Sequence, residues 1–210
     1  MKYLSIIIFV LLISNNIYAD FLWNKKCINA YSLIIQLKFD KAELILEEEI
    51  KENPNNSLVY FIENYSDYLK TLISEEKKDF EKLKKNKEIR LNFIIKDRSS
   101  SPWYLYSQAE IHLQTAANRL KFGEYFYAAI EINKSYRLIQ KNYKLFPKFI
   151  PNKKSLGLLY ATIGSIPEKY HWILNSIGIE GNINSGLKLI NETIQEIKDN
   201  KNFEVLLEET

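Results

Sequence analysis

The sequence predicts an all-helical protein built from antiparallel helical hairpins, and three observations support this. Beyond residue 23, apolar residues recur at spacings of three and four, the period of a helix with one buried face. No segment sustains the strict alternation of apolar and polar residues that a half-exposed strand would show. Proline, glycine and asparagine stand between the periodic segments, where a helix ends and the chain turns.

The periodicity divides the chain into short helical segments that make about five hairpins. The expected helices cover residues 24–37, 41–51, 58–73, 75–95, 102–121, 124–145, 153–163, 167–177, 183–200 and 203–207. In the first two, the residues expected to face inward are Ile28, Tyr31, Ile34 and Ile35, then Ala42, Ile45, Leu46 and Ile50. No link is longer than about six residues or rich in glycine and serine, so residues 20–210 are expected to form one domain.

Particular residues mark where these helices begin and end. Pro54 stops the second helix because proline cannot continue the hydrogen-bond ladder. Ser74, followed by two glutamates, offers a capping oxygen and acids in a positive first turn. Ser101 and Pro102 form a cap followed by proline at the first helical position, where its missing N–H costs nothing.

The first residues predict an export signal, removed after Ala19. Lys2 supplies the positive start, residues 4–13 are almost wholly apolar, and Ala19 is a small residue before a cleavage point. The apolar run is shorter than the about 20 residues that span a bilayer core. Cys27 does not directly follow this run, so we expect no lipid anchor, and the mature protein is expected in the periplasm or at an outer membrane.

Composition excludes several classes of protein. The 210 residues include six glycines, five prolines, one cysteine and two histidines, which rules out a collagen-like chain, a disulfide scaffold and a four-cysteine metal site. Cys27, alone in an oxidising compartment, is expected to be buried as a small apolar residue. Removal of residues 1–19 takes away only Lys2, so the formal net charge falls from +3 to +2.

Enzymatic chemistry has little support in this sequence. His112 and His171, the only histidines, each lie inside an expected helix among apolar or aromatic neighbours and are interpreted as packed or surface residues. There is no glycine-rich phosphate loop, serine–histidine–aspartate set or zinc-binding His-Glu-x-x-His pattern. The consecutive acids at 47–49 and 208–209 are expected to face solvent. We therefore predict a non-catalytic protein without cofactor or metal.

Two hairpins share a spacing of small and aromatic residues that is typical of tetratricopeptide repeats. Close approach of two helices needs small residues where their backbones touch, and an aromatic residue near the turn fills the wedge between them. The residues at these positions are Ala30, Phe39, Ala42 and Pro54 in the first hairpin, and Ala116, Gly123, Tyr125 and Ala128 in the third. The match is irregular: Leu37 replaces the turn glycine of the first copy, and Glu49 stands where a small residue is usual.

A more specific resemblance follows from four segments. They are Ser101-Pro102-Trp103-Tyr104, residues 120–125, residues 150–157 and Gly164-Ser165-Ile166-Pro167. In these segments the chain resembles the N-terminal half of a family of exported bacterial tetratricopeptide-repeat proteins, whose members continue with further repeats. The resemblance implies an irregular tetratricopeptide-like α-solenoid, of which this chain would be a short or truncated form. It implies no catalytic residues and brings no cofactor.

In such an array the first helix of each pair forms the concave surface. The residues expected there include Tyr31, Ile34, Ile35, Glu110, Leu113, Leu120 and Lys121. Exposed, they would accept a helix or an extended peptide through apolar anchors. The alternative is that neighbouring helices cover them in a closed array.

The segment 132–167 has seven basic residues and no acid, interleaved with aromatic residues. The basic residues are Lys134, Arg137, Lys141, Lys144, Lys148, Lys153 and Lys154. They could simply solvate one helix face, or they could bind an acidic protein or an anionic membrane surface. Nucleic acid is not expected as a partner of an exported protein, although such a segment can contact phosphates and bases.

The predicted function is that of a protein–protein interaction scaffold in the cell envelope, using the concave face or the basic strip. The alternative is a small-ligand or glycan-binding module. That module would use an aromatic group that could equally form part of the core: Trp103, Tyr104, Tyr106, Tyr170 and Trp172.

Overall fold

The computed structural model describes residues 21–96, 100–170, 172, 181–198 and 200–208, and throughout these residues the fold is all-α, without strands. The expected signal segment, residues 1–19, lies outside the described residues. So does most of the helix expected at 167–177, of which the structure describes a 3-10 turn, Glu168–Tyr170.

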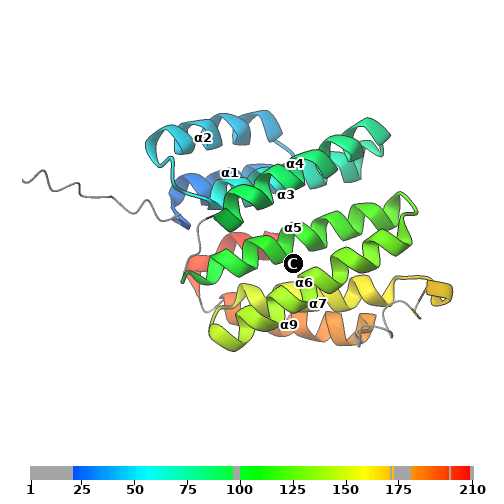
Figure 1. The fold of residues 1–210 in the computed structure, drawn as a ribbon. Coiled ribbons are helices and arrows are strands. Elements are labelled where there is room, and N and C mark those ends of the chain that lie inside the picture. Colours follow the sequence, from blue (N-terminus) through cyan, green and yellow to red (C-terminus); the bar gives the residue numbers. More distant parts are fainter. Residues whose placement is uncertain (1–20, 97–99, 171, 173–180, 199, 209–210) are drawn as a thin grey trace, which may run out of the picture.

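The helices pack as consecutive antiparallel pairs whose axes run roughly alongside one another (Figure 1). The pairs are α1 (Lys25–Ile35) with α2 (Phe39–Glu52), α3 (Leu58–Ser74) with α4 (Lys77–Lys96), α5 (Pro102–Lys121) with α6 (Tyr125–Leu145), and α7 (Pro151–Gly164) with α9 (Ile183–Lys198). The first helices of successive pairs also contact each other, α1 with α3, α3 with α5 and α5 with α7. A 3-10 segment η2 (Lys201–Glu208) then returns to pack on α9 and α1.

The predicted helix starts are confirmed at α5 and modified at α4. Ser101 Oγ accepts a hydrogen bond from Trp103 N at 3.3 Å, and Pro102 opens the helix. At the α3–α4 turn, Ser74 is the last residue of α3, and its Oγ accepts the predicted type of capping hydrogen bond, from Glu76 N at 3.2 Å. Glu75 has φ of +55°, a left-handed conformation that ends α3, so α4 begins at Lys77.

The small residues expected between paired helices are buried. Ala30, Ala42, Ala116 and Ala128 each have no exposed surface. This allows the backbones of α1 and α2, and of α5 and α6, to approach closely, as ridge-into-groove packing requires. Cys27 is likewise fully buried and unpaired, as predicted. Burial raises the pKa of its thiol to about 12, so the sulfur stays protonated.

Aromatic side chains join the N-terminal residues to the centre of the fold. Trp23 stacks on Trp103 with ring centroids 4.7 Å apart, and Phe21 meets Tyr104 edge-on at 6.0 Å. Trp103 also contacts Tyr106 edge-on at 5.4 Å. The segment just after the expected cleavage point is therefore anchored to α5 by ring contacts, each worth about 0.5–1.5 kcal/mol beyond its buried area.

The prediction that Ile50 of α2 faces inward is wrong. Ile50 is 36% exposed, whereas its neighbour Glu49, expected to face solvent, is fully buried. Glu49 is tolerated there because its Oε1 accepts hydrogen bonds from Asn24 Nδ2 and Asn56 Nδ2, both at 2.7 Å. Ala42 and Leu46 are buried as predicted, so the difference is confined to the last turn of α2, where amide donors from the start of α1 and from the α2–α3 link satisfy Glu49.

The α7–α9 pair uses glycine instead of alanine. A Cβ added to Gly186 would lie 2.5 Å from the Gly157 carbonyl oxygen and 2.7 Å from the Ala161 amide nitrogen. Both are backbone atoms, so no side-chain rotation could make room. Only glycine at 186 permits this separation of the two helices.

Leu37 and Gly123 occupy corresponding turns and share a left-handed backbone, with φ of +60° and +75°. A non-glycine residue pays about 1–2 kcal/mol in this conformation. Leu37 is 52% exposed, so little packing would be lost on its removal. We expect Leu37→Gly to raise the free energy of unfolding by about 1 kcal/mol in urea titrations. A Gln36→Gly control, at a neighbouring position with negative φ, should lower it; a destabilised Leu37→Gly protein would contradict the account.

Candidate functional site

The outward face of α6 combines apolar and basic side chains at regular spacing. Its exposed positions follow one another at intervals of three and four: Tyr127, Ile130, Lys134, Arg137, Lys141, Lys144 and, just past the helix, Lys148. Such spacing places the side chains in one row along the helix. We call the five cations of this row, from Lys134 to Lys148, the α6 basic strip.

No acid of the described chain neutralises the α6 basic strip through an ion pair; Arg137 Nε donates to Asn133 Oδ1 at 2.9 Å. The last two basic residues of the segment behave differently. Lys153 pairs with Glu196 of α9, and Lys154, fully buried, lies 3.3 Å from Glu110 Oε2. The predicted basic segment is therefore divided into five cations facing solvent and two engaged in the fold.

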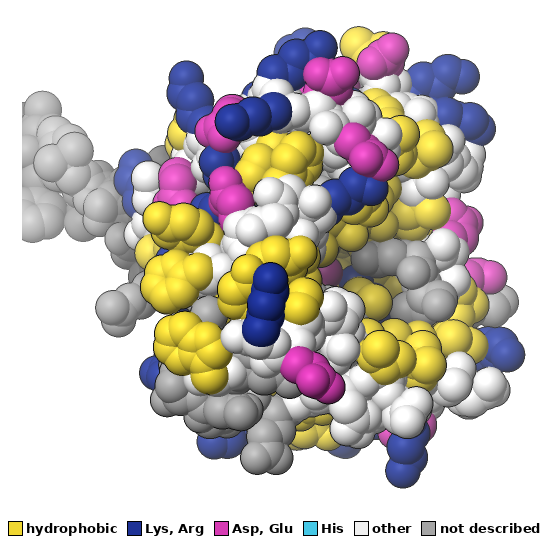
Figure 2. Space-filling view, turned by 90° about the vertical axis from the view of Figure 1, so that its right-hand side faces the viewer, with side chains coloured by type: hydrophobic (Ala, Val, Ile, Leu, Met, Phe, Trp, Pro, Cys, Tyr) yellow, Lys and Arg dark blue, Asp and Glu magenta, His cyan; other side chains and the backbone are white. Residues whose placement is uncertain are grey.

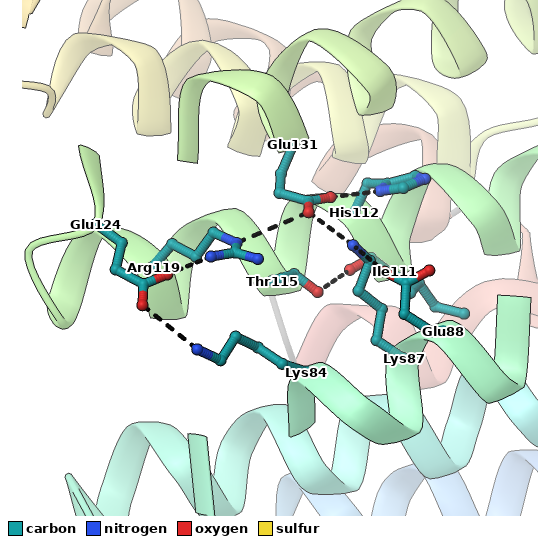
Figure 3. A network of polar contacts seen from close by, with 9 residues as sticks. All are labelled: Lys84, Lys87, Glu88, Ile111, His112, Thr115, Arg119, Glu124 and Glu131. Carbon is teal, nitrogen blue, oxygen red and sulfur yellow. Dashed lines mark hydrogen bonds and ion pairs between the residues drawn. The ribbon is translucent and has the colours of Figure 1, made fainter. Parts of the chain in front are cut away.

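The buried side of α6 carries an ionic network centred on Glu131 (Figure 3). Lys87 Nζ of α4 lies 2.6 Å from Glu131 Oε1, and His112 Nδ1 of α5 lies 2.6 Å from Oε2. Arg119 Nε approaches Oε1 at 3.7 Å. Lys87 is 2% exposed and Glu131 4%. The network therefore joins three helices from two successive pairs, and it fixes the buried side of α6 against α4 and α5.

Burial and ion pairing shift the pKa values of this network in opposite directions. Burial alone would raise the pKa of Glu131, but the hydrogen bond from His112 and the charge of Lys87 lower that pKa to about 2. For His112, burial lowers the pKa and outweighs the raising influence of Glu131. Glu131 thus stays charged because Lys87 and the histidine ring stabilise the carboxylate in place of solvating water.

At the edge of the network, Arg119 also pairs with Glu124, which in turn lies 3.4 Å from Lys84 Nζ. These contacts continue from the α5–α6 turn to α4. His112 is packed, 8% exposed, within this network. His171 lies outside the described residues.

Five of the seven residues predicted on a concave surface are unavailable or only half-exposed there. Tyr31 and Ile34 are fully buried and Leu113 is 5% exposed; Ile35 and Leu120 are half-buried. Tyr31 is covered because α3 packs against α1, with its ring stacked on Tyr65 at a centroid distance of 4.7 Å. The expectation that these residues form an open groove is corrected accordingly: neighbouring helices cover them.

The two charged residues of that prediction are also engaged. Glu110 is 2% exposed, and this burial is tolerated because it accepts a hydrogen bond from Ser155 Oγ and pairs with Lys154, both on α7. Lys121 is exposed and pairs with Glu75 at 2.7 Å. Glu110 therefore ties α5 to α7 instead of contacting a partner.

The aromatic group proposed for ligand binding does not gather around one cavity. Trp103 and Tyr106 are buried in the core, 7% and 1% exposed. Tyr170 instead stacks on Tyr125, and Trp172 is 64% exposed. Nothing in this arrangement favours a glycan pocket over core packing at Trp103 and Tyr106.

Sequence reasoning missed the buried charges Lys87, Glu110, Glu131 and Lys154. One signal was present for Glu131: Ala128 and Ser135 lie three residues before and four after it, on the same helix face. Small residues on either side of an acid leave room for a partner side chain from another helix. The other charges carry no comparable local signal.

No group of three or more metal-ligating side chains occurs in the described part of the chain. Among the helices described, none is both long and apolar enough to cross a membrane. Comparison of the sequence with protein-family models, with curated proteins and with solved structures finds no match.

Proposed function

We propose that this protein is an exported, non-catalytic helical-repeat scaffold that binds an acidic protein partner in the cell envelope through the α6 basic strip. The observation that carries the proposal is the row of five exposed cations that form no ion pair with an acid of the described residues, preceded on the same helix face by the exposed Tyr127 and Ile130. Apolar anchors supply binding energy, while the charges set partner choice and register.

A partner helix with acidic residues at spacings of three and four would complement this row. From Tyr127 to Lys144 the row follows α6 for about 26 Å at 1.5 Å per residue. A linear row of this length suits one helix or one extended segment better than a compact small molecule. The burial of Tyr31 and Ile34 favours this outer face over an inner groove.

The proposed class is a tetratricopeptide-like solenoid of the exported family that the sequence resembles. Supporting it are the consecutive helical pairs, the contacts between their first helices, and the buried alanines at matched positions in the first and third pairs. Export is proposed from the leader-like residues 1–19, which places acidic proteins and anionic lipids among the available partners.

The test is co-purification from an envelope fraction with the triple variant Lys141→Glu, Lys144→Glu, Lys148→Glu. We expect at least a tenfold loss of the bound partner, because each position changes from attraction to repulsion. The matched control reverses three exposed lysines of α4, Lys77, Lys78 and Lys85, and should retain the partner. Equal retention by both variants would remove the strip from the account. If the triple variant loses binding to anionic vesicles while no protein co-purifies with the wild type, the partner is a membrane surface and not a protein.

A further inference from the structure

A groove runs between α2 and α4, with α3 as its floor. It consists of two adjoining cavities, of about 270 and 260 Å³, which share Asp67, Lys70 and Lys82 as lining residues. Their combined volume falls within the range of about 300–1,000 Å³ that ligand sites occupy. We call this feature the α2–α4 groove; it lies apart from the α6 basic strip.

One end of the groove is apolar. Phe39, at the start of α2, and Ile73, at the end of α3, line the first cavity, and Ile73 is 55% exposed. These elements meet at the end of the molecule seen in Figure 2, where hydrophobic side chains form separate patches between charged ones. A ligand bound here would therefore combine an apolar contact with a charged one.

The other end is rich in carboxylates. Glu43 and Glu47 of α2 and Glu63 of α3 line the second cavity. Two cations of α4, Lys82 and Arg90, line the same cavity. Arg90 is already engaged: its Nη1 donates to Asp67 Oδ2 at 2.8 Å and its Nε to Glu63 Oε2 at 3.4 Å.

The charge at this end is therefore incompletely balanced. Burial raises the pKa of Glu63, and the nearby Asp67 and Glu43 add to that effect, so Arg90 does not fully compensate. Glu43 has one distant partner, Lys70 at 4.0 Å. A ligand cation would find charge complementarity between α2 and α3.

The groove already holds one cation of its own chain in such a setting. Lys70 Nζ lies 4.0 Å from Glu43 Oε2 and 5.3 Å from the centre of the Phe39 ring. An ammonium group is thus placed between a carboxylate and an aromatic face, which attracts cations. The same two walls, Phe39 and Glu43, are open to the groove on α2.

The spacing along α2 matches that of an extended peptide. Phe39, Glu43 and Glu47 follow one another by four residues, or about 6 Å of helix rise per step. Side chains on one face of an extended chain recur every second residue, about 6.6–6.8 Å apart. A peptide with an apolar side chain at one position and cations two and four positions later would therefore meet these three residues in turn.

We propose that the α2–α4 groove binds an extended peptide segment with an apolar side chain on Phe39 and Ile73 and lysine or arginine side chains beside Glu43, Glu47 and Glu63. The occupant has the opposite charge to the partner of the α6 basic strip. The protein would then hold two different segments on separate faces.

The probe is a fluorescein-labelled peptide, Ser-Phe-Ser-Lys-Ser-Lys-Ser, compared by fluorescence anisotropy with the same peptide carrying glutamate in place of lysine. We expect the lysine peptide to bind the full-length protein at least tenfold more tightly. The double variant Glu43→Gln, Glu47→Gln should weaken its binding at least tenfold, because the exposed carboxylates are neutralised without a change of size.

The matched control is Glu48→Gln, Glu52→Gln, two exposed acids of α2 that do not line the groove, and it should change binding less than twofold. Circular dichroism should show all variants folded. Equal binding of the two peptides, equal loss in both double variants, or no binding at millimolar peptide would overturn the proposal. The Lys141, Lys144, Lys148 variant should bind the peptide normally, so failure of the strip and of the groove are distinguishable.

Discussion

Replacement of Glu131 by alanine is expected to lower the free energy of unfolding by about 3–5 kcal/mol. The substitution leaves Lys87, 2% exposed, without its 2.6 Å carboxylate partner, and it removes the partner of His112. Removal of one member of a buried pair costs far more than removal of both, because the remaining charge loses its buried partner without regaining water. Lys87 would keep only the exposed Glu88, 3.2 Å from its Nζ, as a counter-ion. Urea denaturation of the single variant measures the loss.

The double variant Lys87→Met, Glu131→Leu provides the control for this prediction. Because it removes both charges and keeps apolar volume, we expect it to recover at least half of the stability lost in Glu131→Ala. A loss below about 1 kcal/mol in the single variant, or a double variant no more stable than Glu131→Ala, would mean that the network does not join α4 to α6 as described.

Replacement of Gly186 by alanine is expected to cost about 3 kcal/mol, the upper part of the usual range for overpacking. Its Cβ would lie 2.5 and 2.7 Å from two backbone atoms of α7, so α9 must move away. The increase in helix propensity from glycine to alanine, up to about 1 kcal/mol, acts in the opposite direction and is too small to compensate.

Gly123→Ala is the matched comparison, measured by the same thermal or urea unfolding. Nothing lies within 4 Å of a Cβ at Gly123, so its cost comes from the left-handed φ alone and should be about 1–2 kcal/mol. A Gly186→Ala protein as stable as the wild type would show that α7 and α9 are farther apart than the structure places them.

Local rules predict the helices of this protein well. Pro102 and Lys121 bound both the expected and the observed helix, because a serine cap, a first-turn proline and a following glycine all act within a few residues. Ala116 and Ala128 were expected between their helices for a similar reason: small residues at fixed offsets determine how closely a hairpin can close.

The buried charges could not be predicted in the same way, because each depends on a residue distant in the sequence. Lys154 is fully buried through Glu110 of another helix, and Glu49 through amides at positions 24 and 56. A sequence pattern treats every lysine or glutamate as exposed unless its partner is known. The α2–α4 groove depends equally on how successive pairs are spaced, which no single helix specifies.

The exposed face of α6 can be predicted from the sequence only in part. Its cations were visible in the sequence as a segment without acids, but the same reasoning included Lys153 and Lys154, which the fold uses internally. Only the packing of α7 against α5 and α9 separates these two lysines from the five that face solvent.

The central claim, that the face of α6 binds an acidic envelope protein, is tested most directly by site-specific photo-cross-linking in intact cells. A photoreactive amino acid at position 141 should give one predominant cross-linked protein with an acidic segment at the attachment site, recovered from the envelope fraction. The same residue at position 78, exposed on α4, should not give that product. Identical products from both positions, or protein found only in the cytosolic fraction, would contradict the claim.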